Sequence, residues 1–181
     1  MSEPTPEKIL IVDDDPAFLE LLRSHLRSFN RPFAEARDGI EALERLRQGS
    51  FALVISDLKM PRMDGLALLH EVRSLYPETG VIVITGYGDG GTYTEVIQAG
   101  AIDFLTKPFF RDELAAKINR ALREQRLIGE LNSLIKALEG QLAEKNATIE
   151  KVRSQLAEAA ERMKQLQAKA VFTTYGPHRV R

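Results

Sequence analysis

Short apolar runs that stop abruptly at acidic or hydroxyl residues are the feature that most constrains the fold of this chain. The clearest runs are Ile9–Val12, Leu53–Ile55 and Val81–Ile84, and weaker ones occur at Phe33–Ala36 and Ile102–Leu105. Stretches with apolar residues at helical spacing separate them. Continuously apolar strands that alternate with amphipathic helices predict a parallel, doubly wound α/β sheet covered by helices on both faces.

Five polar side chains follow the predicted strands at the points where the strands end. Asp13 and Asp14 follow the first strand, Asp57 the third, Thr85 the fourth and Lys107 the fifth. Ligands of open α/β sheets bind at the carboxyl ends of the strands, so these residues are expected on one edge. Three carboxylates repel one another unless a cation joins them, and Mg²⁺ prefers such oxygen ligands.

Each of these residues also has a plain structural explanation. An Asp at a strand-to-helix junction is a common helix cap, and a Lys-Pro turn is ordinary loop chemistry. Five residues in the right order on one edge favour a common site instead. The predicted chemistry is phosphoryl transfer, in which Mg²⁺ neutralises charge, Lys107 pairs with the phosphate and Thr85 hydrogen-bonds one of its oxygens.

Four motifs at these strand ends identify a family resemblance: Ile9–Pro16 (ILIVDDDP), Ser56–Gly65 (SDLKMPRMDG), Thr85–Asp89 (TGYGD) and Gly100–Phe109 (GAIDFLTKPF). Together they resemble the receiver domain of two-component response regulators, over about residues 7–125. The resemblance implies a five-stranded flavodoxin-like fold with strand order 2-1-3-4-5. It also implies a cis peptide bond between Lys107 and the following proline.

The resemblance further implies how the phosphoryl group and the metal are held. Asp57 is expected to accept the phosphoryl group from the phosphohistidine of a histidine kinase. Asp13 and Asp14, directly or through water, are expected to hold Mg²⁺ together with Asp57 and the backbone carbonyl of Lys59. The chain is then no enzyme with a separate substrate, but a phosphoacceptor that assists its own Mg²⁺-dependent phosphoryl transfer and dephosphorylation.

Three further positions correspond to the switch of such receivers. The resemblance implies that Thr85 and Lys107 sense the phosphoryl group and that Phe104 is the aromatic switch residue. Movement of Thr85 toward the phosphoryl group vacates space into which Phe104 rotates, so that a neighbouring face repacks.

Residues 126–170 carry a heptad repeat that predicts a coiled coil continuous with the last receiver helix. With Ile128 at position a, 12 of the 13 a and d positions are apolar, and Lys145 at a d position is the exception. β-branched residues at a with Leu at d, as in Ile128 and Leu131, favour a parallel homodimer. A helix folded back on the receiver is the alternative, but six heptads exceed the length of such a domain.

Charge and composition narrow the remaining possibilities. Residues 1–110 carry a net charge of −6 and residues 111–181 a net charge of +5. This split is compatible with a cation site in the acidic residues 1–110 and an acidic or polyanionic partner for the basic residues 111–181. It is also compatible with two differently charged solvated surfaces. The chain has no Cys, no signal peptide and no apolar run that spans a bilayer, so we expect no membrane association and a cytoplasmic location.

The output of the chain is the part that the sequence leaves open. The basic residues after residue 110 are interleaved with Glu, and no helix-turn-helix, zinc finger or basic-region zipper is recognisable, so we do not expect this chain to bind nucleic acid. We expect the coiled-coil dimer to relay the phosphorylation state to a partner or downstream module. The alternative is that the chain is an N-terminal fragment of a larger DNA-binding transcription regulator or output enzyme. The irregular basic tail, residues 171–181, is compatible with a docking peptide, the stub of another domain or a frayed end.

Overall fold

Five parallel strands form one sheet in the computed structural model, which describes residues 7–86 and 92–174. The strands are β1 (Ile9–Val12), β2 (Phe33–Ala36), β3 (Leu53–Asp57), β4 (Gly80–Thr85) and β5 (Asp103–Thr106). Their order, β2-β1-β3-β4-β5, confirms the predicted doubly wound flavodoxin-like topology. Strand β5 begins one residue later than the apolar pattern indicated. Ile102 packs on the core from the preceding loop, and the apolar pattern does not distinguish such a loop residue from the first residue of a strand.

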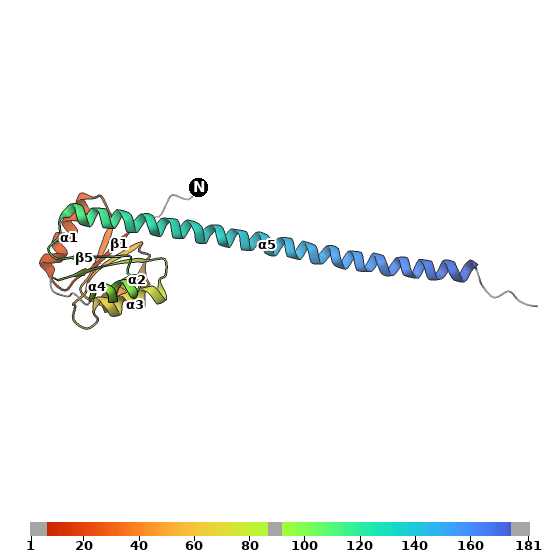
Figure 1. Ribbon diagram of the computed structural model, residues 1–181, viewed down its shortest axis with the longest axis horizontal. Coiled ribbons are helices and arrows are strands. Elements are labelled where there is room, and N and C mark those ends of the chain that lie inside the picture. The colour runs from red at the N-terminus through yellow and green to blue at the C-terminus, as the bar shows by residue number, and fades with distance from the viewer. Residues whose placement is uncertain (1–6, 87–91, 175–181) are drawn as a thin grey trace, which may run out of the picture. The chain divides into compact units, whose positions relative to one another are not determined.

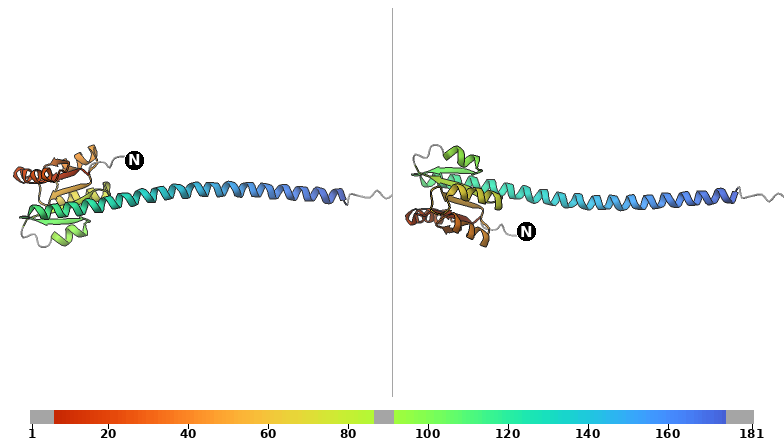
Figure 2. Two further views of the ribbon diagram at one scale, coloured as in Figure 1. Left: turned by 90° about the horizontal axis from the view of Figure 1, so that it is seen from above. Right: turned by 90° about the horizontal axis from the view of Figure 1, so that it is seen from below.

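Helices cover both faces of this sheet, as continuously apolar strands require. They are α1 (Pro16–Ser28), α2 (Gly39–Gln48), α3 (Gly65–Leu75), α4 (Thr92–Gln98) and α5 (Arg111–Thr174). Helices α1 and α5 pack on one face, whereas α2, α3 and α4 pack on the other (Figure 1). Figure 2 shows α1 and α2 toward the β2 side of the sheet and α4 toward the β5 side.

Three helices begin at an Asp whose side chain accepts hydrogen bonds from the first backbone N–H groups. Asp15 caps α1, Asp38 caps α2 and Asp64 caps α3. These bonds satisfy donors that have no partner within the helix. The caps account structurally for three of the acidic residues near the strand ends, and Asp13 and Asp57 are not among them.

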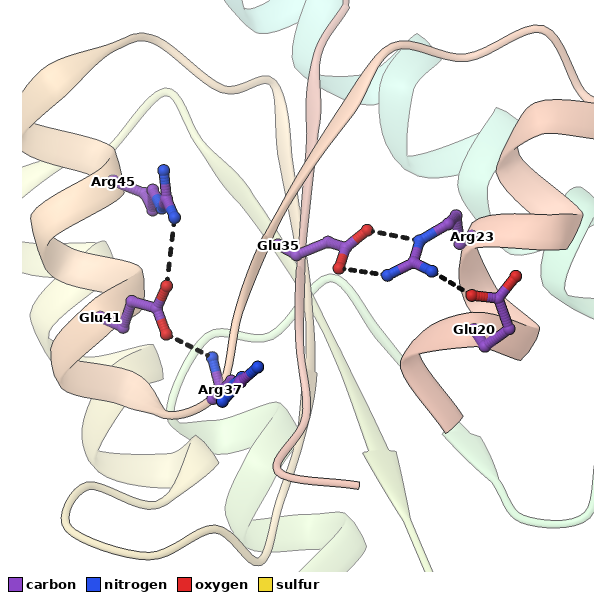
Figure 3. A network of polar contacts seen from close by, with 6 residues as sticks. All are labelled: Glu20, Arg23, Glu35, Arg37, Glu41 and Arg45. Carbon is purple, nitrogen blue, oxygen red and sulfur yellow. Dashed lines mark hydrogen bonds and ion pairs between the residues drawn. The ribbon is translucent and has the colours of Figure 1, made fainter. Parts of the chain in front are cut away.

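The edge strand β2 is held by a network of charged side chains (Figure 3). Arg23 of α1 donates two hydrogen bonds of 2.7 Å to the carboxylate of Glu35 in β2 and also pairs with Glu20. The hydrogen bond from Arg23 lowers the pKa of Glu35. On the α2 side, Glu41 accepts from the Arg45 guanidinium and from the Arg37 backbone N–H. These contacts fix β2, which has only weak apolar character, to α1. They also fix α2 to the loop that precedes it.

The chain divides into two compact units, Met1–Glu130 and Leu131–Arg181, and α5 contributes to both. Helix α5 ends at Thr174, so the prediction that the irregular tail starts at residue 171 is wrong for Val171–Thr174. The β-branched and aromatic residues there lower helix propensity by only a few tenths of a kcal/mol each, too little to end a long helix. Residues 175–181 lie outside the described residues.

Most of the apolar a and d residues between Leu131 and Leu166 are exposed in the single chain. Among the described residues, no helix combines the length and the apolar character needed to cross a membrane.

Neighbouring leucines of α1 allow a direct test of the packing. Leu22 is fully buried against the sheet, whereas Leu21 is 43% exposed. We expect Leu22→Ala to lower the free energy of unfolding by about 2–5 kcal/mol, because it leaves a cavity in the core. Leu21→Ala should lower it by less than about 1 kcal/mol. Urea unfolding of the full chain, followed by tyrosine fluorescence, measures both, and equal losses would contradict the assigned packing.

Candidate functional site

The strand register brings the predicted polar residues to one edge of the sheet. Val12 of β1 pairs with Ser56 of β3, so the residues that follow them, Asp13 and Asp57, are neighbours. On the other side of β3, Thr85 at the end of β4 pairs with Thr106 of β5, and Lys107 follows directly. The parallel sheet therefore places two carboxylates, a hydroxyl and an ammonium at its carboxyl edge.

The Lys107 ammonium lies between two carboxylates. Its Nζ is 3.0 Å from Oδ2 of Asp13 and 2.6 Å from Oδ1 of Asp57. The Lys107 backbone N–H donates to the Thr85 carbonyl at 2.7 Å, which fixes the start of the loop. The peptide bond between Lys107 and Pro108 is cis, which confirms the sequence prediction.

The two carboxylates differ in how they are bonded and how far solvent reaches them. Oδ1 of Asp13 accepts from the Asp15 backbone N–H at 2.8 Å, and only 2% of the Asp13 side chain is exposed. Oδ2 of Asp57 accepts from the Lys59 backbone N–H at 2.7 Å, and 12% of the Asp57 side chain is exposed. Asp57 is thus the more exposed of these two carboxylates.

Burial and charge act against each other at this edge. Burial raises the pKa of Asp13 above its usual value, and the hydrogen bond from Asp15 and the Lys107 ammonium offset this only in part. Burial by itself would lower the pKa of Lys107. Hydrogen bonds to Asp57 and Asp13 outweigh that effect, so the Lys107 pKa is raised and the ammonium stays charged.

The other predicted site residues lie around the cluster of Asp13, Lys107 and Asp57, at different depths from solvent. Thr85 is buried, and Phe104 is half-buried against the core cluster on the α2, α3 and α4 face. Asp14 is exposed and lines a shallow cavity of about 660 Å³ together with Lys59. Of the motif at residues 85–89, positions 87–89 lie outside the described residues.

No three Asp, Glu, His or Cys side chains in the described ranges are arranged as a metal-binding group. The three-carboxylate magnesium site therefore stays a prediction. The donors nevertheless suit Mg²⁺ chemically: Asp13 and Asp57 offer hard oxygen ligands that already converge on one cation, the Lys107 ammonium. The exposed Asp14 follows Asp13 directly.

A larger cavity, of about 700 Å³, lies between the C-terminal ends of α2 and α3 and contains none of the predicted site residues. Its lining combines apolar and polar side chains, Phe51, Tyr76 and Thr79 among them. This cavity therefore lies apart from the charged groups at the carboxyl edge of the sheet.

Two residues that shape the site were not singled out as site residues from the sequence. A Cβ on Gly65 would lie 2.2 Å from the Asp57 carbonyl oxygen, so only glycine allows this close approach. Its signal is the glycine that closes the motif SDLKMPRMDG. The ring centroid of Phe18 lies 3.6 Å from Lys107 Nζ. Its helical spacing indicates only a core-facing residue, and no motif signals the contact.

A scan against family models matches residues 9–119 to the response regulator receiver domain. Among curated proteins, the chain is 34% identical over 149 residues to the transcriptional regulatory protein ZraR of Escherichia coli O157:H7, covering 82% of this chain and 34% of that protein. It is 36% identical over 131 residues to the C4-dicarboxylate transport transcriptional regulatory protein DctD of Rhizobium meliloti (strain 1021). This match covers 72% of this chain and 28% of that protein. The chain thus spans about a third of the length of these relatives.

Solved structures with the same fold include a CheY-like response regulator receiver domain protein from Methanospirillum hungatei JF-1, with 32% identity and a TM-score of 0.64. The match covers 67% of this chain and 98% of that one. NtrX from Brucella abortus is also similar, with 34% identity and a TM-score of 0.67, and the match covers 72% of this chain and 30% of that one.

The raised pKa of Asp13 predicts that its charge opposes folding. In the absence of divalent metal at pH 7, we expect Asp13→Asn to raise the free energy of unfolding, since the substitution removes a buried charge and keeps nearly the same side-chain shape. Urea unfolding measures the change.

The pH dependence of that gain follows from the direction of the shift. The native pKa of Asp13 is higher than the unfolded one, so the penalty is complete above the native pKa and shrinks as the pH falls through it toward 3.8. The advantage of Asp13→Asn should therefore be smaller at pH 4.5 than at pH 7. An advantage that grows toward low pH would reverse the sign assigned to Asp13.

Proposed function

Because this chain belongs to the response regulator receiver domain family, we propose that it accepts a phosphoryl group from a histidine kinase on the carboxylate of Asp57. The observation that carries the proposal is the pairing of the Lys107 ammonium with Asp13 and Asp57, of which Asp57 is the more exposed. A nucleophile must be reachable, and a positive charge beside it stabilises the phosphoryl group that it receives.

The transfer that we propose exchanges one bond for another. A carboxylate oxygen of Asp57 attacks phosphorus, the bond from phosphorus to the kinase histidine nitrogen breaks, and that imidazole takes up a proton. Lys107 lies within 2.6 Å of the Asp57 carboxylate and balances the charge of the acyl phosphate formed. Mg²⁺, held by Asp13, Asp14, Asp57 and the Lys59 carbonyl, would supply further neutralisation of the phosphoryl oxygens.

Polar contacts join strand β5, beside Phe104, to α5. Thr85 and Phe104 are the proposed switch pair, on adjacent strands β4 and β5. Beside Phe104, Asp103 accepts from the Phe104 backbone N–H and from Lys117 of α5, each at 2.8 Å. The Lys117 ammonium is also 5.5 Å from the Phe104 ring centroid. Rotation of that ring would therefore disturb a polar contact between the first part of α5 and the sheet.

We further propose that α5 dimerises the protein as a parallel coiled coil and relays the phosphorylation state to a partner or downstream module. The support is the heptad pattern together with the exposure of its a and d residues, since Ile135 is 45% and Leu138 55% exposed in the single chain. A parallel pair brings identical Ile and Leu residues into register and covers them.

A second candidate function is favoured by the curated relatives. Both are named as transcriptional regulatory proteins, and the similarity to ZraR extends over 149 residues. On this reading the chain is the receiver part of a transcription regulator, and α5 connects it to the output. The phosphorylation chemistry at Asp57 is the same in both candidates.

Substitution of the acceptor tests the proposed chemistry. With Mg²⁺ and an acetyl-phosphate-type donor, the full chain should gain one phosphoryl group, and Asp57→Asn should gain none. Intact-mass spectrometry measures the addition. Labelling of Asp57→Asn at the wild-type rate would remove Asp57 from its role.

Asp14→Ala is the matched variant for the metal in this experiment. We expect it to keep the acceptor but to need a higher Mg²⁺ concentration for half-maximal labelling, because the carboxylate repulsion that favours a cation falls. An unchanged Mg²⁺ requirement would exclude Asp14 from the metal site.

Cross-linking tests the orientation of the proposed dimer. Leu131→Cys should form a disulfide with itself in the partner chain under mild oxidation, because position d faces its own copy in a parallel coil. Sedimentation equilibrium of the unmodified chain should show a dimer. A monomer at tens of micromolar, or cross-linking of Leu131→Cys only to Leu166→Cys, would contradict the parallel arrangement.

A further inference from the structure

A third group contacts the Lys107 ammonium besides the two carboxylates. The ring centroid of Phe18, in the first turn of α1, lies 3.6 Å from Nζ, well inside the range of an attractive cation–π contact. Asp13, Asp57 and the ring of Phe18 thus surround the same ammonium. The carboxylates attract it through hydrogen bonds, and the ring attracts it through the negative face of its π system.

Local structure on both sides fixes the position of the ring. The Asp13 carboxylate accepts from the Asp15 backbone N–H, the Asp15 side chain caps α1, and Pro16 starts that helix, so Phe18 follows the carboxylate at a set position. On the other side, the ring of Phe109 meets that of Phe18 edge-to-face, with centroids 5.9 Å apart and an interplanar angle of 88°. Phe109 comes two residues after Lys107, so the same loop supplies both the ammonium and the support for the ring.

From this geometry we propose that Phe18 is a positioning residue for phosphoryl transfer: it holds the Lys107 ammonium against Asp57 both before and after that carboxylate carries the phosphoryl group. The inference rests on the proposed function of Asp57. Hydrogen bonds to a carboxylate are directional, and one of them changes its acceptor when Asp57 is phosphorylated. The attraction of the ring face is less directional, so it persists while the ammonium moves from a carboxylate oxygen to a phosphoryl oxygen.

The contact also limits the other places that the ammonium can occupy. The Lys107 side chain is 28% exposed, so water competes with the carboxylates for it. The ring covers one side of the ammonium with a surface that excludes water yet still attracts positive charge. A leucine at position 18 would also exclude water, but without that attraction, and the ammonium would spend more time away from Asp57.

Fluorination of the ring separates its electrostatic attraction from its packing. Fluorine atoms withdraw charge from the ring face and change its size little, so 4-fluoro-, 3,5-difluoro- and 3,4,5-trifluorophenylalanine at position 18 form a graded series. We expect the rate of phosphorylation of the full chain by acetyl phosphate with Mg²⁺ to fall stepwise, to about one third to one tenth for the trifluoro ring. The rate of Phe18→Leu should fall at least as far. The rate of Phe18→Tyr, which keeps the ring face, should stay within about twofold of the wild-type rate.

Phe33 provides the matched control, because it packs against the same core cluster as Phe18. Trifluorophenylalanine at position 33 should leave the rate unchanged. A flat series at position 18, or an equal loss at position 33, would overturn the positioning role, because the effect would then be absent or due to packing alone.

A second measurement on the unphosphorylated protein separates failure of this inference from failure of the proposed function. The ring current of Phe18 should shift the ε-methylene protons of Lys107 upfield in the NMR spectrum, and Phe18→Leu should abolish the shift while Phe18→Tyr retains it. An unshifted Lys107 signal in the wild type would overturn the contact itself. If the contact is present but no chain in the series accepts a phosphoryl group, the proposed function fails, and the positioning role fails with it.

Discussion

Two carboxylates at neighbouring strand ends repel each other at neutral pH, and the shared ammonium of Lys107 makes their close approach possible. Asp13 is almost fully buried, and burial raises its pKa, so its charge is tolerated only because Lys107 and the Asp15 backbone N–H bind it. The same ammonium contacts Asp57, 2.6 Å away. Strands β1, β3 and β5 are thereby joined at the edge where the chemistry is proposed, and the electrostatic balance of this edge depends on one side chain.

The acidic triplet after β1 shows how adjacent residues of one type acquire different roles. Asp13 faces Lys107, Asp14 is exposed, and Asp15 caps α1. The direction in which the backbone leaves the strand decides these roles, because successive side chains of an extended segment point to different sides. The cap also sets the place of Phe18, whose ring contacts the ammonium that binds Asp13. Helix capping and site formation are therefore parts of one local structure.

The fold was predictable because the inner strands β1, β3 and β4 are short apolar runs that helices bury on both faces, and because the motifs at the strand ends are specific to one family. The family resemblance implied the strand order, and the proximity of Asp13, Asp57 and Lys107 followed from their places at the carboxyl ends of parallel strands. The contact of Phe18 with Lys107 was not predictable, since it joins α1 to the loop after β5 and depends on side-chain conformation. The end of α5 was predicted too early, because β-branched residues near Val171 weaken a helix without ending it.

A double-mutant cycle on the free energy of unfolding tests most directly whether the shared ammonium organises the site. The cycle combines Lys107→Met with Asp57→Asn, in the absence of divalent metal at pH 7. The account predicts that the two changes are not additive, with a coupling energy of about 1–3 kcal/mol, because each substitution removes the partner of the other. Additivity within about 0.5 kcal/mol would contradict it, since Lys107 and Asp57 would then contribute to the folded state independently of each other.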